Sequence, residues 1–403
     1  MPPPPSSATA GPVSIQRRDF ALTLALLWFA GVALRATILA LPPVLPAVTA
    51  ELRLSAATIG LLAALPSLLF ALVSLPAALL ILRLGAIPTL VLGLCVNALG
   101  AGARGFAQDP LGLAVASAVM CLGVAAMQPV MPVLVRAWSP GRVGFATAVY
   151  TNGLLVGEVV PNIWIPRGEL PLVGAGWRAA LTIWMIPVLA TAAGFLLSGR
   201  RSAAASAPTR GRLAWADGRV WRAGLLLGGV NASYFGLNGF LPGWFTATGR
   251  PDLVQPALVA LNLAQIPASL LMLGLADRLV RRPAAYGVGS AVFVAGVLGM
   301  ILGPGLVAVA AAGVAGFATA ILLTLALAVP SVLGTGEEVP RLSAAMFSIG
   351  YGFAVVVALL AGQLWNATGL AVLAVLPFAA TAALPGLLAW STLRRRDPLP
   401  SSG

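Results

Sequence analysis

Residues 61–85 read LLAALPSLLFALVSLPAALLILRLG and contain a single charged residue, Arg83, near the end of the stretch. About 20 mostly apolar residues are enough for a helix to cross the hydrocarbon core of a bilayer. Eleven similar stretches occur in the chain, so the sequence predicts an all-α membrane protein with twelve transmembrane helices. The twelve apolar runs lie near residues 20–41, 57–82, 86–104, 110–136, 143–164, 176–198, 221–246, 254–280, 284–303, 306–333, 341–362 and 369–393.

The composition excludes most classes of soluble protein. The 403 residues are 59% hydrophobic and 9% charged, with a mean hydropathy of +0.97, whereas a soluble domain has about 25% charged residues. Histidine is absent, and Cys95 and Cys121 lie inside apolar runs, so neither a metal site nor an enzyme is expected. Without lysine or a phosphate-binding G-x-x-x-x-G-K-[ST] loop, ATP is not expected as an energy source, and no cofactor is predicted.

A polar stretch separates the twelve runs into two sets of six. Its core reads RRSAAASAPTRGRLAWADGR, over residues 200–219. The halves also resemble each other, because ALNLAQIPASLLMLGLADRLVRR at 260–282 repeats the leucine-rich helix, the proline and the terminal arginine of residues 61–85. We expect a disordered tail (1–16), a first six-helix bundle (17–198), a cytoplasmic linker (199–220), a second six-helix bundle (221–396) and a final tail (397–403).

The positive charge of the chain predicts its orientation. All 24 basic residues are arginines, and the net charge is +13. If the N-terminus is inside, 18 arginines fall in inner segments, five in outer segments, and Arg35 within a helix. Arginine is retained on the cytoplasmic side of membranes, so we expect both termini in the cytoplasm, in a bacterial inner membrane. The lipid bilayer then accounts for the charge, and no nucleic-acid partner is expected.

The loops after the second and eighth runs carry a family motif. The second half has Gly274, Asp277, Arg278, Arg281 and Arg282, which resemble the G-x-x-x-D-R-x-G-R-R type motif of major facilitator transporters. The six-loop-six layout is also that of this family. The resemblance implies two six-helix bundles and a gating role for the motif, in which the aspartate accepts hydrogen bonds at a helix end. The first half departs from the motif, with Ala78 and Leu79 at the expected aspartate and arginine positions and only Arg83 retained.

Two longer strings indicate a narrower resemblance. ALRATILALPPVLPAV (33–48) and MQPVMPVLVRAWSPGRVGFATAVYTNGLLVG (127–157) are similar to the cyanate/nitroimidazole permease family. That family is linked to small anions and small polar heterocycles. The resemblance therefore implies a small-molecule substrate, an anion or a small heterocycle, and a protein that acts as a monomer.

Arg35 and Glu158 are the two charged residues well inside apolar runs. A charge at the centre of a membrane helix costs about 2.5–3.5 kcal/mol on insertion scales, so it should face a cavity or a partner. Arg35 is a candidate anion anchor, because its guanidinium has five fixed donors; the alternative is a salt bridge between helices. Glu158 is a candidate partner of Arg35, a proton-coupling carboxylate, or a contact for a cationic group of the substrate.

Polar side chains in other runs predict the rest of a substrate cavity. Asn231, Tyr234 and Asn238 recur at spacings of three and four residues, so they share one helix face; the alternative is hydrogen bonding between helices. Individually weaker candidates are Gln128, Tyr150, Asn152, Asn262, Gln265 and Tyr351.

Taken together, these features predict a secondary active transporter. We expect it to move a small anionic or polar solute by alternating access, with a proton through Glu158 as the first hypothesis for coupling. The alternative is an exporter of a small toxic or drug-like compound.

Overall fold

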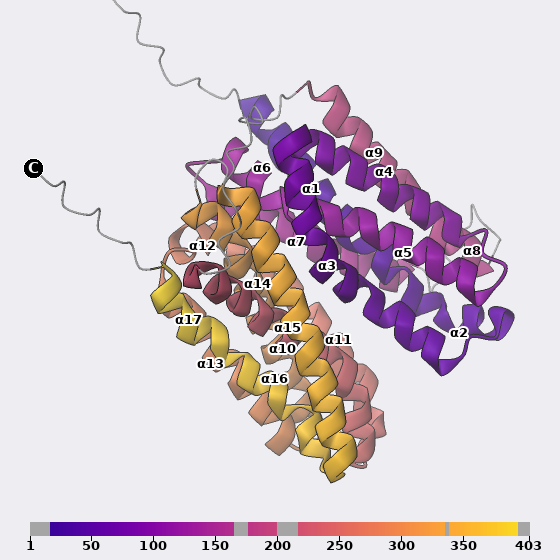
Figure 1. The fold of residues 1–403 in the computed structure, drawn as a ribbon. Coiled ribbons are helices and arrows are strands. Elements are labelled where there is room, and N and C mark those ends of the chain that lie inside the picture. Colours follow the sequence, from indigo (N-terminus) through magenta and orange to yellow (C-terminus); the bar gives the residue numbers. More distant parts are fainter. Residues whose placement is uncertain (1–16, 165–175, 200–216, 335–337, 394–403) are drawn as a thin grey trace, which may run out of the picture.

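The computed structural model describes residues 17–164, 176–199, 217–334 and 338–393, and this part of the chain is almost entirely helical (Figure 1). The predicted tails and most of the predicted linker lie outside the described residues. Eleven of the described helical spans are long and apolar enough to cross a membrane. A twelfth, α10 (Gly218–Ala247), is 30 residues long and is more polar because it carries Asn231, Tyr234 and Asn238. The prediction of twelve helices is confirmed.

The helices of the first half are α1 (Arg17–Leu39), α2 (Leu41–Leu52), α3 (Ala56–Leu84), α4 (Ala86–Arg104), α5 (Pro110–Met127), α6 (Val130–Trp138), α7 (Val143–Trp164), α8 (Gly176–Thr182) and α9 (Met185–Leu197). Those of the second half are α10 (Gly218–Ala247), η1 (Pro251–Leu253), α11 (Val254–Leu263), α12 (Gln265–Leu279), α13 (Pro283–Leu302), α14 (Gly305–Leu333), α15 (Glu338–Thr368), η2 (Ala371–Ala374), α16 (Leu376–Thr381) and α17 (Ala383–Leu393).

Five of the spans are built from two consecutive helices, and a proline lies within two residues of each junction. Proline lacks a backbone N–H and clashes with the carbonyl of the residue four positions before it, so it bends or interrupts a helix. The first span therefore turns at its junction and continues to Leu52, so the predicted end near residue 41 is wrong. The prolines at the junctions are Pro42, Pro129, Pro187, Pro267 and Pro385.

The helices form two bundles that follow the two halves of the sequence, from indigo to magenta and from orange to yellow in Figure 1. Across the boundary, α3 packs against α15, and α7 packs against α12 and α14. Within the first bundle, α1 packs along α7; within the second, α10 packs along α15. These helices surround the boundary between the bundles and carry nearly all the predicted site residues.

The two bundles are close together at the end where α1 begins and α17 ends, which we call the termini end. They spread apart toward the opposite end, the far end (Figure 1). A Cβ added at Gly352 of α15 would meet Ala71 of α3 at 4.0 Å, whereas one added at Gly60, nearer the far end of α3, would meet nothing within 4 Å. The helices that face each other across the boundary thus separate toward the far end.

Candidate functional site

Glycines bring α1 and α7 into backbone contact and place Arg35 beside Glu158. A Cβ added at Gly31 would lie 2.2 Å from the Tyr150 carbonyl oxygen, and one at Gly157 would lie 2.6 Å from the carbonyl oxygen of α1 residue Val32. Such small residues allow membrane helices to approach closely. Arg35 is four residues after Gly31 and therefore on the same face of α1, while Glu158 directly follows Gly157. The packing of the two helices therefore places both charged groups at the same level along the helix axes.

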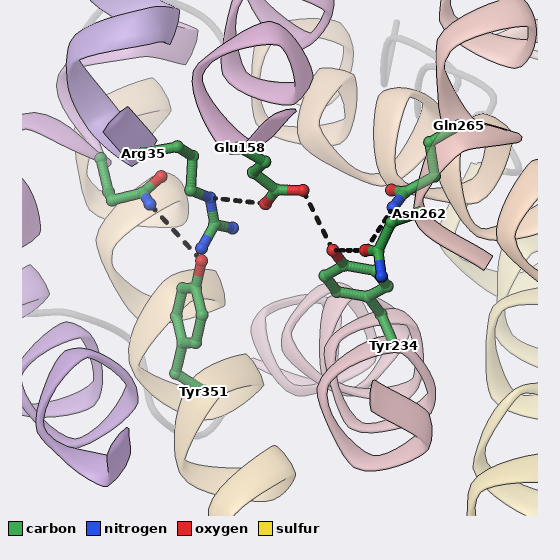
Figure 2. Close-up of polar contacts among 7 residues, drawn as sticks. Arg35, Glu158, Tyr234, Asn262, Gln265 and Tyr351 are labelled. Carbon is green, nitrogen blue, oxygen red and sulfur yellow. Dashed lines mark hydrogen bonds and ion pairs between the residues drawn. The ribbon is translucent and has the colours of Figure 1, made fainter. Parts of the chain in front are cut away.

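Arg35 and Glu158 form a buried ion pair. Arg35 Nε is 3.3 Å from Glu158 Oε1, and the two side chains are 4% and 9% exposed (Figure 2). The pair is close in distance, but the Arg35 N–H at Nε has no hydrogen-bond acceptor among the described residues. The contact offsets part of the cost of two charges inside a membrane domain.

The second bundle covers this ion pair with three aromatic side chains. The Tyr234 hydroxyl of α10 is 3.0 Å from Glu158 Oε2, and the guanidinium of Arg35 lies 5.3 Å from the centre of the Phe235 ring. The Tyr351 hydroxyl of α15 lies beside the Arg35 guanidinium (Figure 2). Tyr234 and Tyr351 are near the middle of helices of 30 and 31 residues. The site is therefore central and is shared by both bundles.

A network of amides continues from Tyr234 into the second bundle. The Tyr234 hydroxyl is 2.8 Å from Asn262 Oδ1, and Asn262 Nδ2 donates to Asn238 Oδ1 at 2.9 Å. Gln265 Nε2 lies 3.3 Å from the same Asn262 Oδ1. Asn262 and Gln265 flank the junction of α11 and α12, which Pro267 follows by two residues. The interrupted helix thus presents two amides to the site.

Further polar links cross between the bundles toward the termini end, and two of them involve predicted site residues. Gln128 Nε2 lies 3.4 Å from the Tyr351 hydroxyl. Trp28 Nε1 donates to Asn152 Oδ1 at 2.9 Å, and Asn152 Nδ2 donates to the Ser269 hydroxyl of α12 at 2.9 Å. Gln128 and Asn152 therefore connect the bundles, and their described hydrogen bonds are with protein groups.

Several buried polar atoms near the boundary have no hydrogen-bond partner in the described part of the chain. They include Arg35 Nε, Asn231 Nδ2, Tyr150 Oη and Gln265 Oε1. Buried donors and acceptors are nearly always satisfied by protein, water or ligand. Asn231 lies four residues before Phe235 and so shares its face of α10. Asn231 and Arg35 therefore both offer unused donors at this part of the boundary.

At the termini end, Asp277, the aspartate of the family motif, connects the two bundles. Its Oδ1 accepts a hydrogen bond from the Phe145 backbone N at 2.8 Å, in the first turn of α7, and its Oδ2 is 3.6 Å from Arg142 Nε. A Cβ added at Gly144 would lie 2.6 Å from the backbone of Asp277, so the two helix ends nearly touch. The other predicted gating residues, Arg278, Arg281 and Arg282, are exposed.

Among the described residues, the first half makes no equivalent contact from the positions that correspond to the motif aspartate and arginine. Ala78 is buried at 2% exposure and Leu79 is exposed at 58%, and neither side chain can accept a hydrogen bond. Among the described residues, the motif therefore contributes a helix-end contact from the second half only, where Asp277 of α12 contacts the start of α7.

Sequence reasoning missed some members of the site and misplaced one. Asn238 does not face Arg35; it donates to the Tyr234 carbonyl and accepts from Asn262. Phe235 was missed because an aromatic residue in an apolar run gives no signal of its own. Ser269 was missed for a similar reason, because a lone serine is common inside membrane helices. Both positions become apparent only when the two bundles are placed side by side.

Comparison with known proteins shows which family shares this architecture. The model of the Major Facilitator Superfamily matches residues 27–261. The chain is also 24% identical over 274 residues to the uncharacterized transporter YycB of Bacillus subtilis (strain 168), and the match covers 67% of each chain.

Solved transporters have the same fold at low sequence identity. The proton:xylose symporter XylE superposes with a TM-score of 0.73 at 14% identity, over 93% of this chain and 96% of its own. The fucose transporter FucP in its outward conformation gives 0.71 at 15% identity, over 93% and 98%. The human organic anion transporter MFSD10 gives 0.72 at 16% identity, over 93% and 99%. At these identities the likeness establishes the fold.

Proposed function

This chain belongs to the major facilitator superfamily, and we propose that it is a secondary transporter that moves a small anionic or polar solute by alternating access. The solute would bind at the boundary of the two bundles, at Arg35. A proton carried by Glu158 is the proposed coupling ion. Both termini would be cytoplasmic, in a bacterial inner membrane.

The observation that carries this proposal is the buried guanidinium of Arg35 at the boundary. Arg35 is 3% exposed and is contacted by Glu158 of its own bundle and by Phe235 and Tyr351 of the other. An arginine keeps its charge under all physiological conditions and has a planar fork of donors that suits an oxyanion. In a transporter, an intramembrane charge between the moving halves is the natural place for a charged solute.

The arrangement of the bundles supports alternating access around this site. Described hydrogen bonds between the bundles extend along α7 from Glu158 to Phe145, on the side of the site nearer the termini end. The arginine distribution supports a cytoplasmic location of the termini end. The structure would then be the outward-facing state, and solute release to the cytoplasm would require these bonds to break.

The first test is a search for ligands of the purified protein. A specific ligand raises the unfolding temperature, because it stabilises the folded state to which it binds. We expect one or more small anions or polar heterocycles to raise the unfolding temperature of the wild type. The proposed site predicts that Arg35→Lys, which keeps the charge but loses the planar fork, weakens this effect.

The second test is transport by the reconstituted protein. Uptake and release of the solute found in the screen are measured in proteoliposomes, for the wild type and for Arg35→Lys. Arg53→Lys, a change at the exposed end of α2, is the matched control and should leave transport unchanged. Equal affinity and rate in the wild type and Arg35→Lys would refute the role of Arg35, and movement of solute outward alone would favour the exporter.

A further inference from the structure

The hydrogen bonds around Tyr234 determine whether the network has a place for a proton on Glu158. Asn238 Nδ2 donates to the Tyr234 carbonyl at 3.1 Å, so the Asn238 side-chain oxygen is directed toward Asn262. Asn262 Nδ2 donates both to that oxygen and to the Leu258 carbonyl, each at 2.9 Å. The remaining Asn262 atom, Oδ1, is therefore an acceptor, and the direction of the whole network is set.

Tyr234 has one hydroxyl hydrogen for two oxygen neighbours, Asn262 Oδ1 at 2.8 Å and Glu158 Oε2 at 3.0 Å (Figure 2). If Glu158 is ionised, Tyr234 can donate to only one of them at a time. If Glu158 is protonated, its carboxyl donates to the Tyr234 oxygen and Tyr234 donates to Asn262, so both contacts are hydrogen bonds. The network can therefore accommodate a proton on Glu158 Oε2.

The net charge of the Arg35–Glu158 pair depends on whether Glu158 is protonated. The charged and titratable groups that act on Glu158 include Arg35 from α1, Tyr234 from α10 and Tyr351 from α15. With Glu158 ionised, the pair with Arg35 has no net charge. With Glu158 protonated, the charge of Arg35 is uncompensated, and a buried uncompensated charge is strongly unfavourable. One negative charge from outside the protein would restore the balance.

We propose that the site carries one monoanion together with one proton, the anion at the Arg35 guanidinium and the proton on Glu158 Oε2. This rests on the proposed function of Arg35 and extends it to the charge of the substrate and the coupling ratio. The empty site holds Arg35 paired with ionised Glu158, and the loaded site holds Arg35 paired with the anion. Both forms have zero net charge, so the transport cycle moves no net charge across the membrane.

The unused donors agree with an anion as the second partner of Arg35. Arg35 Nε, 3.3 Å from Glu158 Oε1, makes an ion pair without a hydrogen bond. Asn231 Nδ2 is a buried donor without an acceptor among the described residues, and it lies on the face of α10 that Phe235 presents to Arg35. A dianion would leave the loaded site negative, and a neutral solute would leave it positive. The charge balance therefore selects monoanions.

The experiment measures the unfolding temperature of the full-length protein with nitrate, cyanate, formate or sulfate over the pH range in which it stays folded. We expect a monoanion to stabilise the wild type, with an affinity that falls about tenfold per pH unit where Glu158 is ionised, since one proton is bound with each anion. Sulfate should bind more weakly. In Glu158→Gln, whose amide donates to Tyr234 as the protonated acid does, the affinity should not depend on pH.

A second variant tests the role of the network. Asn262→Ala removes the acceptor of the Tyr234 hydroxyl, so the pH at which affinity begins to fall should decrease by about one unit, the equivalent of one hydrogen bond. In proteoliposomes, a dye inside the vesicles should report proton entry with the anion. A membrane potential imposed by potassium diffusion should leave the rate of anion uptake unchanged, because the proposed cycle moves no net charge.

The outcomes separate the two proposals. A wild-type affinity that does not depend on pH, or a transport rate that responds to the membrane potential, would overturn the coupling of one proton to one monoanion while leaving the anion site intact. If no anion stabilises either the wild type or Glu158→Gln, the anion site at Arg35 is itself refuted.

Discussion

Replacement of Asp277 should open the termini end, because this residue joins the bundles by two interactions of unequal strength. Its Oδ1 accepts from the Phe145 backbone N at 2.8 Å in the first turn of α7. Its Oδ2 is 3.6 Å from Arg142 Nε, and the two side chains of that ion pair are 36% and 57% exposed. Both contacts join the two bundles at the closed termini end, so we expect their loss to shift the equilibrium toward an open state.

The two contacts differ in their expected energies. Loss of a side-chain acceptor at the start of a helix costs about 1 kcal/mol, and loss of the negative charge near that helix end and Arg142 costs about 0.5–1 kcal/mol. Asp277→Ala should therefore shift the equilibrium by about 1.5–2 kcal/mol, or about ten- to thirtyfold, at 1.4 kcal/mol per tenfold. Asp277→Asn keeps an acceptor and should shift it about two- to fivefold. Arg142→Gln should shift it about twofold.

The populations of the closed and open states can be measured from the distribution of distances between two spin labels at the termini end. Leu84 of α3 and Ala284 of α13 are exposed positions in different bundles. They would be replaced by cysteine in a background without Cys95 and Cys121. The population with the longer distance should increase in the order wild type, Arg142→Gln, Asp277→Asn, Asp277→Ala.

Equal effects of Asn and Ala at position 277 would refute the hydrogen bond to α7 as the main contribution. A larger effect of Arg142→Gln than of Asp277→Asn would show instead that the exposed ion pair dominates. Unchanged distances in all three variants would mean that Asp277 does not hold the termini end closed.

Three other changes test the packing and polar contacts of the site. Gly31→Ala places a Cβ 2.2 Å from a carbonyl of α7 and should lower stability by about 1–3 kcal/mol in thermal unfolding, whereas Gly60→Ala, which meets nothing within 4 Å, should not. Glu158→Ala leaves the Arg35 charge without its carboxylate and should cost about 3–5 kcal/mol; adding Arg35→Ala should recover most of this loss, and a double variant no more stable than the single would contradict the pairing. Asn152→Ala removes a hydrogen bond between the bundles and should increase the open population about fivefold, from about 1 kcal/mol, in the same distance measurement.

The prolines and polar residues of the helices show what sequence could and could not predict about the site. Asn262 and Gln265 were recognisable as polar residues in an apolar run, but the sequence alone did not indicate that the helix is interrupted between them. Pro66 and Pro76 lie inside α3 without ending it, whereas Pro267 accompanies a junction. Whether a proline interrupts a helix depends on the neighbouring helices that replace the lost hydrogen bond, and these are not local in sequence.

The close packing of α1 on α7 is another feature that the residues permit but do not specify. Gly31 and Gly157 appear in sequence as ordinary glycines of an apolar run. Only the structure shows that each meets a backbone carbonyl of the opposite helix. Their positions explain why Arg35 and Glu158, 123 positions apart in the chain, are at one height.

The amino-acid sequence is sufficient to predict a membrane protein of twelve helices, because the need to match a bilayer with apolar residues acts on each run of about 20 residues separately. Arg35 and Glu158 also stand out in the sequence, since a charge inside such a run is costly wherever it occurs. That these two groups meet, and that Tyr234, Phe235 and Tyr351 cover them from the other bundle, is apparent only in the folded structure. Contacts between bundles depend on how two apolar surfaces fit, and the hydrophobic pattern of either bundle alone does not contain that information.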